Sequence, residues 1–435
     1  MLFDYVLRNG RIAGGTPDLV NIGIRDGRIA AISPDISMMA RDSARDIAIN
    51  GRLLVPGFVE THIHLDKSCI SDRCTCHTNK LKDVIAAVAS AKQSFTEEDI
   101  YARGRRTLEK AIVQGTTRMR THVEVDPRIG LKGFNAVGQL KRDFAWAMDI
   151  ELCVFPQEGL LNDPGCDELL VEACENGAGS IGGVPYVDTD PNGQIARIFE
   201  LARHYDLDID FHLDFDLDPL WMHLDEVCRQ TDVYGWGGRV AIGHVSKLSA
   251  LDEVSLKAAG VRLASAGVAV TVLPATDLYL MGRDASHLVP RGVAPAHRLL
   301  EWGVTCSLST NNVLNPFTPF GDCSLVRMAN LYANVAHAGQ PAELAACLDM
   351  VTRLPAKLMN LKDYGIVVGN VADIIALDCA SPEAAVAELA QPLFGMKGGR
   401  ISFSRDAAVV NWPGSVATRD DGFSNARMGG NSGLA

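Results

Sequence analysis

The chain has 435 residues, of which 47% are hydrophobic and 22% charged, with 41 Lys and Arg against 53 Asp and Glu. The resulting charge of −12 argues against nucleic-acid binding, because contact with phosphates requires a cationic surface. No apolar stretch reaches the ~18–20 residues of a membrane span, and the first residues lack the basic segment of a signal peptide. Eleven cysteines without a repeated Cys-x-x-Cys indicate reduced thiols, so we expect a cytoplasmic protein.

Short apolar runs separated by turns occupy residues 5–56. Three dipeptides in this segment favour type I′ hairpin turns, namely Asn9-Gly10, Asp26-Gly27 and Asn50-Gly51. The same pattern returns at residues 371–377 and 397–403. We therefore predict one small composite β-sandwich domain from residues 1–56 and 365–412, rather than two unrelated β segments. Residues 413–435 are rich in Gly, Ser, Asp and Asn, which predicts a disordered tail.

The segment 57–364 alternates strand patterns with amphipathic stretches. The predicted strands are Val55–His62, Thr117–Val123, Ile150–Pro156, Ser180–Tyr186, Leu207–His212, Arg239–His244, Val268–Leu273 and Val304–Ser309. Helical patterns between them include Glu97–Gln114, Cys166–Asn176, Gln194–Tyr205 and Leu220–Gln230. The alternation predicts an α/β fold, a (β/α)8 TIM barrel, in which catalytic groups follow the C-terminal ends of the strands. A doubly wound open sheet is the alternative, but no Gly-x-Gly-x-x-Gly follows the first strand.

Five of the eleven histidines lie at the ends of four predicted strands, namely His62, His64, His122, His212 and His244. His62 and His64 are two residues apart, so a strand directs both to one face, where two imidazoles can bind one metal ion. A lone His-x-His is weak evidence, whereas five histidines at four strand ends predict a metal centre at the mouth of the barrel.

The run from Pro56 to Lys67, Pro-Gly-Phe-Val-Glu-Thr-His-Ile-His-Leu-Asp-Lys, resembles the first-strand motif of the amidohydrolase superfamily. Within it, the likeness is to the branch of cytosine deaminase and N-isopropylammelide amidohydrolase. Supporting segments are 120–123, 155–159, 210–212 and 364–366. The resemblance extends from about residue 5 to residue 412. It implies a barrel with a composite β domain, a small-molecule substrate and a homo-oligomer.

The resemblance also implies one divalent metal ion, Zn²⁺ or Fe²⁺. Binuclear relatives carry a carboxylated lysine at the end of the fourth strand, and residues 180–188 contain no lysine. The nitrogen ligands implied by the resemblance are His62, His64 and His212. His244 would orient the metal-bound water, and Gln157 would read the amide edge of a pyrimidine or triazine ring. Lys67 is similar to a lysine of the N-isopropylammelide enzyme and is expected to contact the substrate.

Two positions depart from the pattern of this branch. The eighth strand normally ends in an Asp that ligates the metal and accepts a proton, and counting back from Pro316 places Asn311 there. An amide oxygen can ligate only weakly and is a poor base. A natural Asn and an engineered exchange of the nearly isosteric Asp both fit the sequence. Phe317, the aromatic residue of the same pattern, is expected to line the substrate pocket.

The second departure is Phe215, which replaces the Glu that shuttles a proton in the deaminases of this branch. Loss of such acid–base assistance typically costs 10²–10⁴-fold in rate. Asp214 and Glu124 lie two residues beyond histidines and are candidate replacements, as are Asp66 and Lys67. Asp66 is also expected to hold a ligand histidine by a hydrogen bond.

These features predict a metal-dependent hydrolase of a C–N bond in a small cyclic amidine or amide, either a deaminase or an N-alkyl amidohydrolase. The alternative is a non-catalytic relative that keeps the barrel as a scaffold, which Asn311 and Phe215 favour. C–S or C–Cl hydrolysis on the same fold stays open. The run Asp277–Met281 after the seventh strand is interpreted as core, pocket wall or an oligomer contact.

Overall fold

Eight parallel strands form the barrel in the computed structural model, which describes residues 2–410 except 17, 36, 38, 43–44, 75–79 and 409. The strands are β8 (Phe58–Ile63), β9 (Thr116–Glu124), β10 (Asp149–Phe155), β11 (Ser180–Ile181), β12 (Asp208–Leu213), β13 (Val240–His244), β14 (Val268–Val272) and β15 (Cys306–Leu308). They pair in chain order, and a parallel bridge between Ile63 and Asn311 joins the first strand to the end of the last. The predicted (β/α)8 barrel is thereby confirmed.

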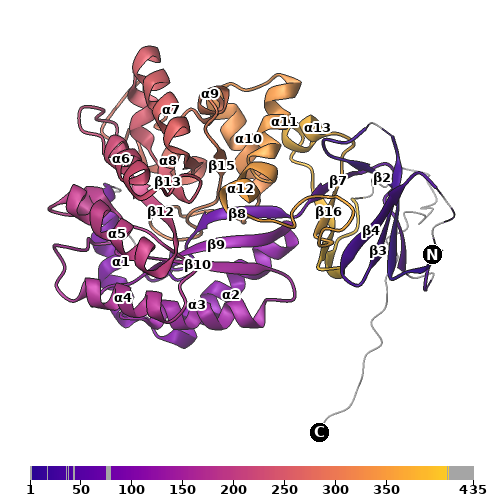
Figure 1. Ribbon diagram of the computed structural model, residues 1–435, viewed down its shortest axis with the longest axis horizontal. Helices are drawn as coiled ribbons and strands as arrows, with labels where there is room; N and C mark the ends of the chain where they lie inside the picture. Colours follow the sequence, from indigo (N-terminus) through magenta and orange to yellow (C-terminus); the bar gives the residue numbers. More distant parts are fainter. Residues whose placement is uncertain are drawn as a thin grey trace, which may run out of the picture.

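Helices surround these strands (Figure 1). They are α1 (Leu81–Ala91), α2 (Glu97–Val113), α3 (Lys132–Asp143), α4 (Cys166–Glu175), α5 (Pro191–Tyr205), α6 (Leu224–Tyr234), α7 (Glu253–Ala266), α8 (Pro274–Leu280), α9 (Ala296–Glu301), α10 (Leu325–Ala336), α11 (Pro341–Asp349), α12 (Arg353–Leu358) and α13 (Pro382–Ala387). Short 3₁₀ turns are η2 (Lys92–Ser94), η3 (Pro185–Val187) and η4 (Ser246–Ala250). Side-chain caps fix several helix starts: Thr96 accepts the N–H of Asp99, and Asp252 accepts that of Ser255.

Three predicted elements differ from the structure for identifiable reasons. The first strand is divided at Gly57 into β7 and β8. The fourth ends at Ile181, because Pro185 has no N–H for a strand and begins η3 instead. Helix α6 starts four residues later than predicted, where the Asp214 carboxylate accepts the N–H groups of His223 and Leu224.

The two ends of the chain share one eight-stranded sheet. Its order is β18-β17-β16-β7-β2-β3-β4, with β6 paired to β2. The strands are β2 (Tyr5–Ile12), β3 (Val20–Arg25), β4 (Arg28–Ser33), β6 (Asp46–Ala48), β7 (Leu53–Pro56), β16 (Ile374–Leu377), β17 (Pro392–Lys397) and β18 (Arg400–Ser404). A separate pair joins β1 (Leu2–Phe3) to β5 (Met39–Ala40). The predicted β domain is therefore confirmed as a composite of both ends; the predicted tail 413–435 lies outside the described residues.

Of the three predicted turns, Asp26-Gly27 connects β3 and β4 with both φ angles positive. Asn9-Gly10 instead lies inside β2, where the register with β3 shifts and Asn9 has a φ of 55°. A positive φ at Asn marks a bulge as readily as a turn, so this dipeptide did not distinguish the two.

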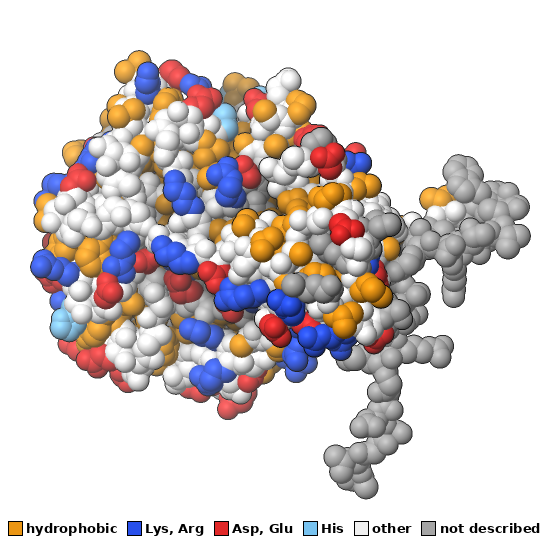
Figure 2. Space-filling model, turned by 45° about the vertical axis from the view of Figure 1, so that its right-hand side comes forward, with side chains coloured by type: hydrophobic (Ala, Val, Ile, Leu, Met, Phe, Trp, Pro, Cys, Tyr) orange, Lys and Arg blue, Asp and Glu red, His pale blue; other side chains and the backbone are white. Residues whose placement is uncertain are grey.

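The β domain lies to one side of the barrel (Figure 1), and Gly57 alone separates β7 from β8. A Cβ atom at Gly57 would lie 2.1 Å from Thr117 Oγ1, so only glycine fits this close approach. In Figure 2, acidic and basic side chains are interspersed over most of the face drawn. Among the described residues, no helix combines the length and the apolar character needed to span a membrane.

Candidate active site

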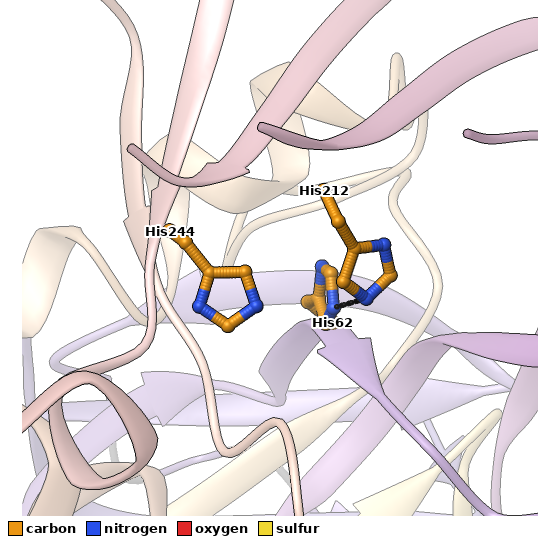
Figure 3. A group of neighbouring side chains, drawn as sticks. All are labelled: His62, His212 and His244. Atoms are coloured by element: carbon orange, nitrogen blue, oxygen red, sulfur yellow. Dashed lines mark hydrogen bonds between the residues drawn. The ribbon is translucent and has the colours of Figure 1, made fainter. Parts of the chain in front are cut away.

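Three histidines converge at the C-terminal ends of the barrel strands. His62 lies in β8, His64 directly follows that strand and His212 lies in β12, and all three are buried. The Nε2 atom of His212 lies 3.1 Å from that of His62 and 3.3 Å from that of His64. Three nitrogens bound tetrahedrally to one ion at 2.0–2.1 Å would be ~3.4 Å apart, and both the His212–His62 and the His212–His64 distance are close to this value. Figure 3 shows the nitrogen of His212 beside that of His62, with the two ring planes at 71° to each other.

These three imidazoles are expected to be neutral, which is the state that a metal ligand requires. Burial lowers the pKa of His62, His64 and His212 well below the usual range, and neighbouring positive charge lowers it further. A neutral imidazole is the form that binds a metal. Gly243 on β13 leaves room for this arrangement, since a Cβ there would lie 3.1 Å from the His62 ring.

Asn311 follows β15 and lines the same pocket as His64 and His212. Its N–H donates to the carbonyl of His62, and its carbonyl accepts the N–H of His64, which fixes its backbone at a φ of 64°. Its side-chain oxygen is buried without a hydrogen-bonding partner. An unpaired buried carbonyl oxygen is costly, and a cation beside the three imidazoles would satisfy it.

His244, at the end of β13, lies beside the His62–His212 pair and forms with it a group whose nitrogens lie within 4.8 Å of one another (Figure 3). Its Nδ1 atom is 2.6 Å from Oδ1 of Asp277, on α8. Burial raises the pKa of the Asp277 carboxyl, and His244 counteracts this shift. Asp277 was assigned no role from the sequence, although a carboxylate five residues beyond β14 at the mouth of the barrel was a usable signal.

His122 lies beneath this group rather than within it. Its ring stacks on that of His62 with centroids 3.7 Å apart. Asp210 lies below both, with Oδ1 3.6 Å from His122 Nε2 and 3.9 Å from His62 Nδ1. Its other oxygen accepts from Arg120, which is also fully buried. His62, His122 and Asp210 form a second group that could hold a cation.

One wall of the pocket is formed by Lys67, Gln157 and Phe317. The Lys67 ammonium donates to Oε1 of Glu124 at 2.7 Å and to Oε1 of Gln157 at 2.9 Å. It also lies 4.6 Å from the centroid of the Phe317 ring. An ammonium has three N–H groups, so one is left after these two hydrogen bonds. Because Gln157 Oε1 accepts from lysine, its NH₂ group is left to donate.

Glu124 is held between two lysines. Lys92, from η2, donates to Glu124, Asp126 and Glu158 at 2.6–2.8 Å. Burial acts to raise the pKa of Glu124, but Lys67 and Lys92 outweigh it and lower the pKa. For Glu158 burial prevails and the pKa is raised. The sequence analysis did not identify Lys92, Asp126 or Glu158, because no local motif connects them.

The remaining predicted relay residues make hydrogen bonds to the backbone. Asp214 accepts from the first N–H groups of α6, and Asp66 accepts from the N–H groups of Lys67 and Glu124. Phe215, in place of the expected Glu, lies against His244 with ring centroids 3.8 Å apart. Burial raises the pKa of Glu60 to about 7, although it accepts backbone N–H groups of Thr310 and His62.

His64, His212, His244 and Asn311 line a small pocket together with Lys67, Gln157, Phe215 and Phe317. Besides those already named, Tyr186, Thr276 and Asn312 line it. The described part of the lining carries histidines, one ammonium, amides and aromatic rings, and no carboxylate.

The amidohydrolase family model matches residues 134–403, well over half of the chain. The chain belongs to the amidohydrolase family. This confirms the resemblance seen in the sequence and, with it, a hydrolase of the amidohydrolase type.

Individual relatives are similar over most of the chain. The N-isopropylammelide isopropyl amidohydrolase of Pseudomonas sp. (strain ADP) is 27% identical over 94% of this chain and 99% of its own length. The pterin deaminase of Rhizobium rhizogenes is 29% identical over 74% of each. Among solved structures, 5-methylcytosine deaminase from Klebsiella pneumoniae superposes with a TM-score of 0.89 at 27% identity, over 94% of this chain and 100% of that one.

Proposed function

We propose that this amidohydrolase cleaves the bond between a ring carbon and an exocyclic nitrogen of a small cyclic amidine or amide, such as a pyrimidine or triazine. The observation that carries the proposal is the position of His212 Nε2, 3.1 Å from that of His62 and 3.3 Å from that of His64, beside a pocket lined by Lys67 and Gln157. The relatives named above, which include deaminases and an N-alkyl amidohydrolase, support the same class of reaction.

One divalent ion, zinc or iron, held by His62, His64 and His212 and more weakly by Asn311, would supply Lewis-acid activation of the attacking water. Water oxygen replaces nitrogen on the ring carbon, and the nitrogen leaves as ammonia or an amine. One proton therefore passes from the water to the leaving nitrogen. His244 Nε2 faces this region and is the group we assign to accept it. The hydrogen bonds of Asp214 and Glu124 favour positioning roles for these two carboxylates.

The lining also constrains the substrate. Lys67 has one N–H group left and Gln157 an NH₂ group, while no carboxylate of the described residues lines the pocket. A ring that presents carbonyl oxygens or an anionic edge would match these donors. Phe317 offers an apolar face beside them. We therefore favour a ring with at least one oxo group over an all-amino ring.

The test begins with metal content per chain, measured on protein purified without added metal. Near one equivalent of zinc or iron, followed by release of ammonia or an amine from oxo-pyrimidines and oxo-triazines, is the expected result. A site that stays empty and refuses both metals would instead favour the non-catalytic scaffold, for which Asn311 and Phe215 are the supporting observations. A metal-loaded protein that releases only thiol or halide would indicate hydrolysis of a C–S or C–Cl bond instead of a C–N bond.

Two further features belong to the proposal. We infer a cytoplasmic enzyme from its free cysteines. We also infer a homo-oligomer, because Leu220, Trp221 and Leu288 are large apolar side chains with at least 77% of their surface exposed. Sedimentation velocity distinguishes an oligomer from a monomer, and Trp221→Lys should weaken an assembly in which Trp221 is buried.

A further inference from the structure

The imidazole of His244 has a buried acidic partner. Asp277 is fully buried, and its Oδ1 atom lies 2.6 Å from His244 Nδ1. Its Oδ2 atom accepts the N–H of Leu273 at 3.2 Å, while its own N–H donates to the carbonyl of Leu273. The carboxylate is thus fixed at the start of α8, in the segment that follows β14.

This contact determines which ring nitrogen carries the proton. An ionised carboxylate can only accept, so the 2.6 Å contact requires the hydrogen on His244 Nδ1. The other nitrogen, Nε2, is then left with its lone pair. Figure 3 shows one ring nitrogen of His244 turned toward His62 and His212, and because Nδ1 contacts Asp277 we assign this nitrogen as Nε2.

Within the described part of the chain, no second hydrogen-bonding side chain competes for the ring. Among the described residues, Asp277 is the only side chain that hydrogen-bonds His244. The near neighbour on its face is Phe215, an apolar ring with its centroid 3.8 Å away. The orientation of His244 therefore depends on Asp277 more than it would in a polar surrounding.

We propose that Asp277 is a positioning residue, which holds His244 in the Nδ1–H tautomer and aims the Nε2 lone pair at the pocket. Its effect on turnover rests on the function proposed above, whereas its effect on the tautomer does not. The role matters in this chain because Phe215 cannot accept a hydrogen bond from the attacking water. The amide of Asn311 is a weaker acceptor than an imidazole. In the opposite tautomer, Nε2–H would point at the same water as a donor.

The first test is the exchange Asp277→Asn, which keeps the shape but offers an NH₂ group to Nδ1 and so favours the opposite tautomer. Loss of the correct histidine tautomer in a comparable site lowers kcat by orders of magnitude. We expect kcat to fall on the order of 10²-fold or more, with KM changed by less than about threefold, because the substrate-binding residues are untouched. Asp252→Asn, the same exchange at the cap of α7, is the matched control and should leave both constants unchanged.

A double-mutant cycle separates positioning from a structural role. In the background of His244→Gln, adding Asp277→Asn should cost nothing further, since the residue it acts through is gone. Equal losses in both backgrounds would overturn the proposal.

A second measurement is independent of turnover. It is an NMR measurement on zinc-loaded protein with ¹⁵N-labelled histidine. The signals that disappear in His244→Gln are assigned to His244. We expect a protonated Nδ1 and an unprotonated Nε2 in the wild type, reversed or averaged in Asp277→Asn. An unprotonated Nδ1 in the wild type, or no change in the variant, would overturn the inference. The expected spectra together with absent turnover would instead refute only the proposed function.

Discussion

Asn311 carries an amide where a carboxylate would be the stronger ligand. Its side-chain oxygen is buried and unpaired beside the imidazoles. Asn311→Asp adds a full negative charge at that position, so we expect the protein to bind zinc at least about tenfold more tightly in competition with a chelator. The measurement requires no substrate.

The neighbouring residue provides the control. Asn312 also lines the pocket, but its oxygen accepts from Asn315. Asn312→Asp should therefore change zinc affinity much less. Equal gains at both positions would mean that only the added charge matters and that Asn311 is not a ligand.

Gly243 limits how far the His62 ring can move. A methyl group there would lie 3.1 Å from two ring atoms of His62, and His122 is stacked close to the same ring. Gly243→Ala should displace the ring by a few tenths of an ångström and weaken zinc binding by about 10-fold, with little change in secondary structure. Unchanged zinc affinity, measured beside a normal circular dichroism spectrum, would show that the ring has more freedom than the packing indicates.

At the scale of elements, η2 places Lys92 between three carboxylates. Glu124 is the last residue of β9, Asp126 follows that strand, and Glu158 follows β10. Removing one partner of a buried ion pair leaves uncompensated charge and typically costs ~3–5 kcal/mol. Lys92→Met should lower the free energy of unfolding by about that amount. Arg105→Met, which breaks an exposed pair with Glu109 on α2, should leave the free energy of unfolding almost unchanged.

The same variant has a predictable pH dependence. Burial already raises the pKa of Glu158, and without Lys92 the pKa of Glu124 should rise as well. A carboxyl whose pKa is higher in the folded than in the unfolded state stabilises the fold at low pH, and this stability is lost as pH rises through the folded pKa. The deficit of Lys92→Met should therefore be larger at pH 8 than at pH 5. A deficit that grows on acidification would contradict this account.

The elements that could be predicted are those marked by a pattern within a short stretch of the sequence. Apolar runs gave seven of the strands to within a few residues, and histidines at strand ends located the pocket. The fourth strand was overestimated, because Gly182 and Gly183 fit a strand pattern, whereas β11 ends at Ile181 and η3 begins at Pro185. The pairs Lys92–Glu124 and His244–Asp277 join residues 32 and 33 apart, and no periodicity in the sequence specifies such contacts.

At the scale of the molecule, the sheet of the β domain depends on both ends of the chain. β16 pairs with β7 over four residues, and Leu54, Ile374 and Phe394 share one apolar core. A chain that stops at residue 365 would lose β16, β17 and β18 and expose that core. We expect it to be insoluble or unfolded, whereas a chain ending at residue 410 keeps every described strand. Soluble, zinc-binding protein from the shorter chain would show that the barrel folds without the completed sheet.

The position of β16 along the chain also has a consequence for synthesis on the ribosome. β7 leaves the exit tunnel before the first barrel strand, but its antiparallel partner follows only after the last one. While the barrel is translated, one edge of β7 exposes backbone N–H and C=O groups that the nascent chain cannot yet pair. Because Gly57 alone separates this edge from β8, which carries His62 and is followed by His64, the strand proposed to bind the metal emerges next to an unpaired edge. Completion of the small sheet, and not of the barrel, is therefore the last step by which a newly made chain pairs this edge and is protected from aggregation.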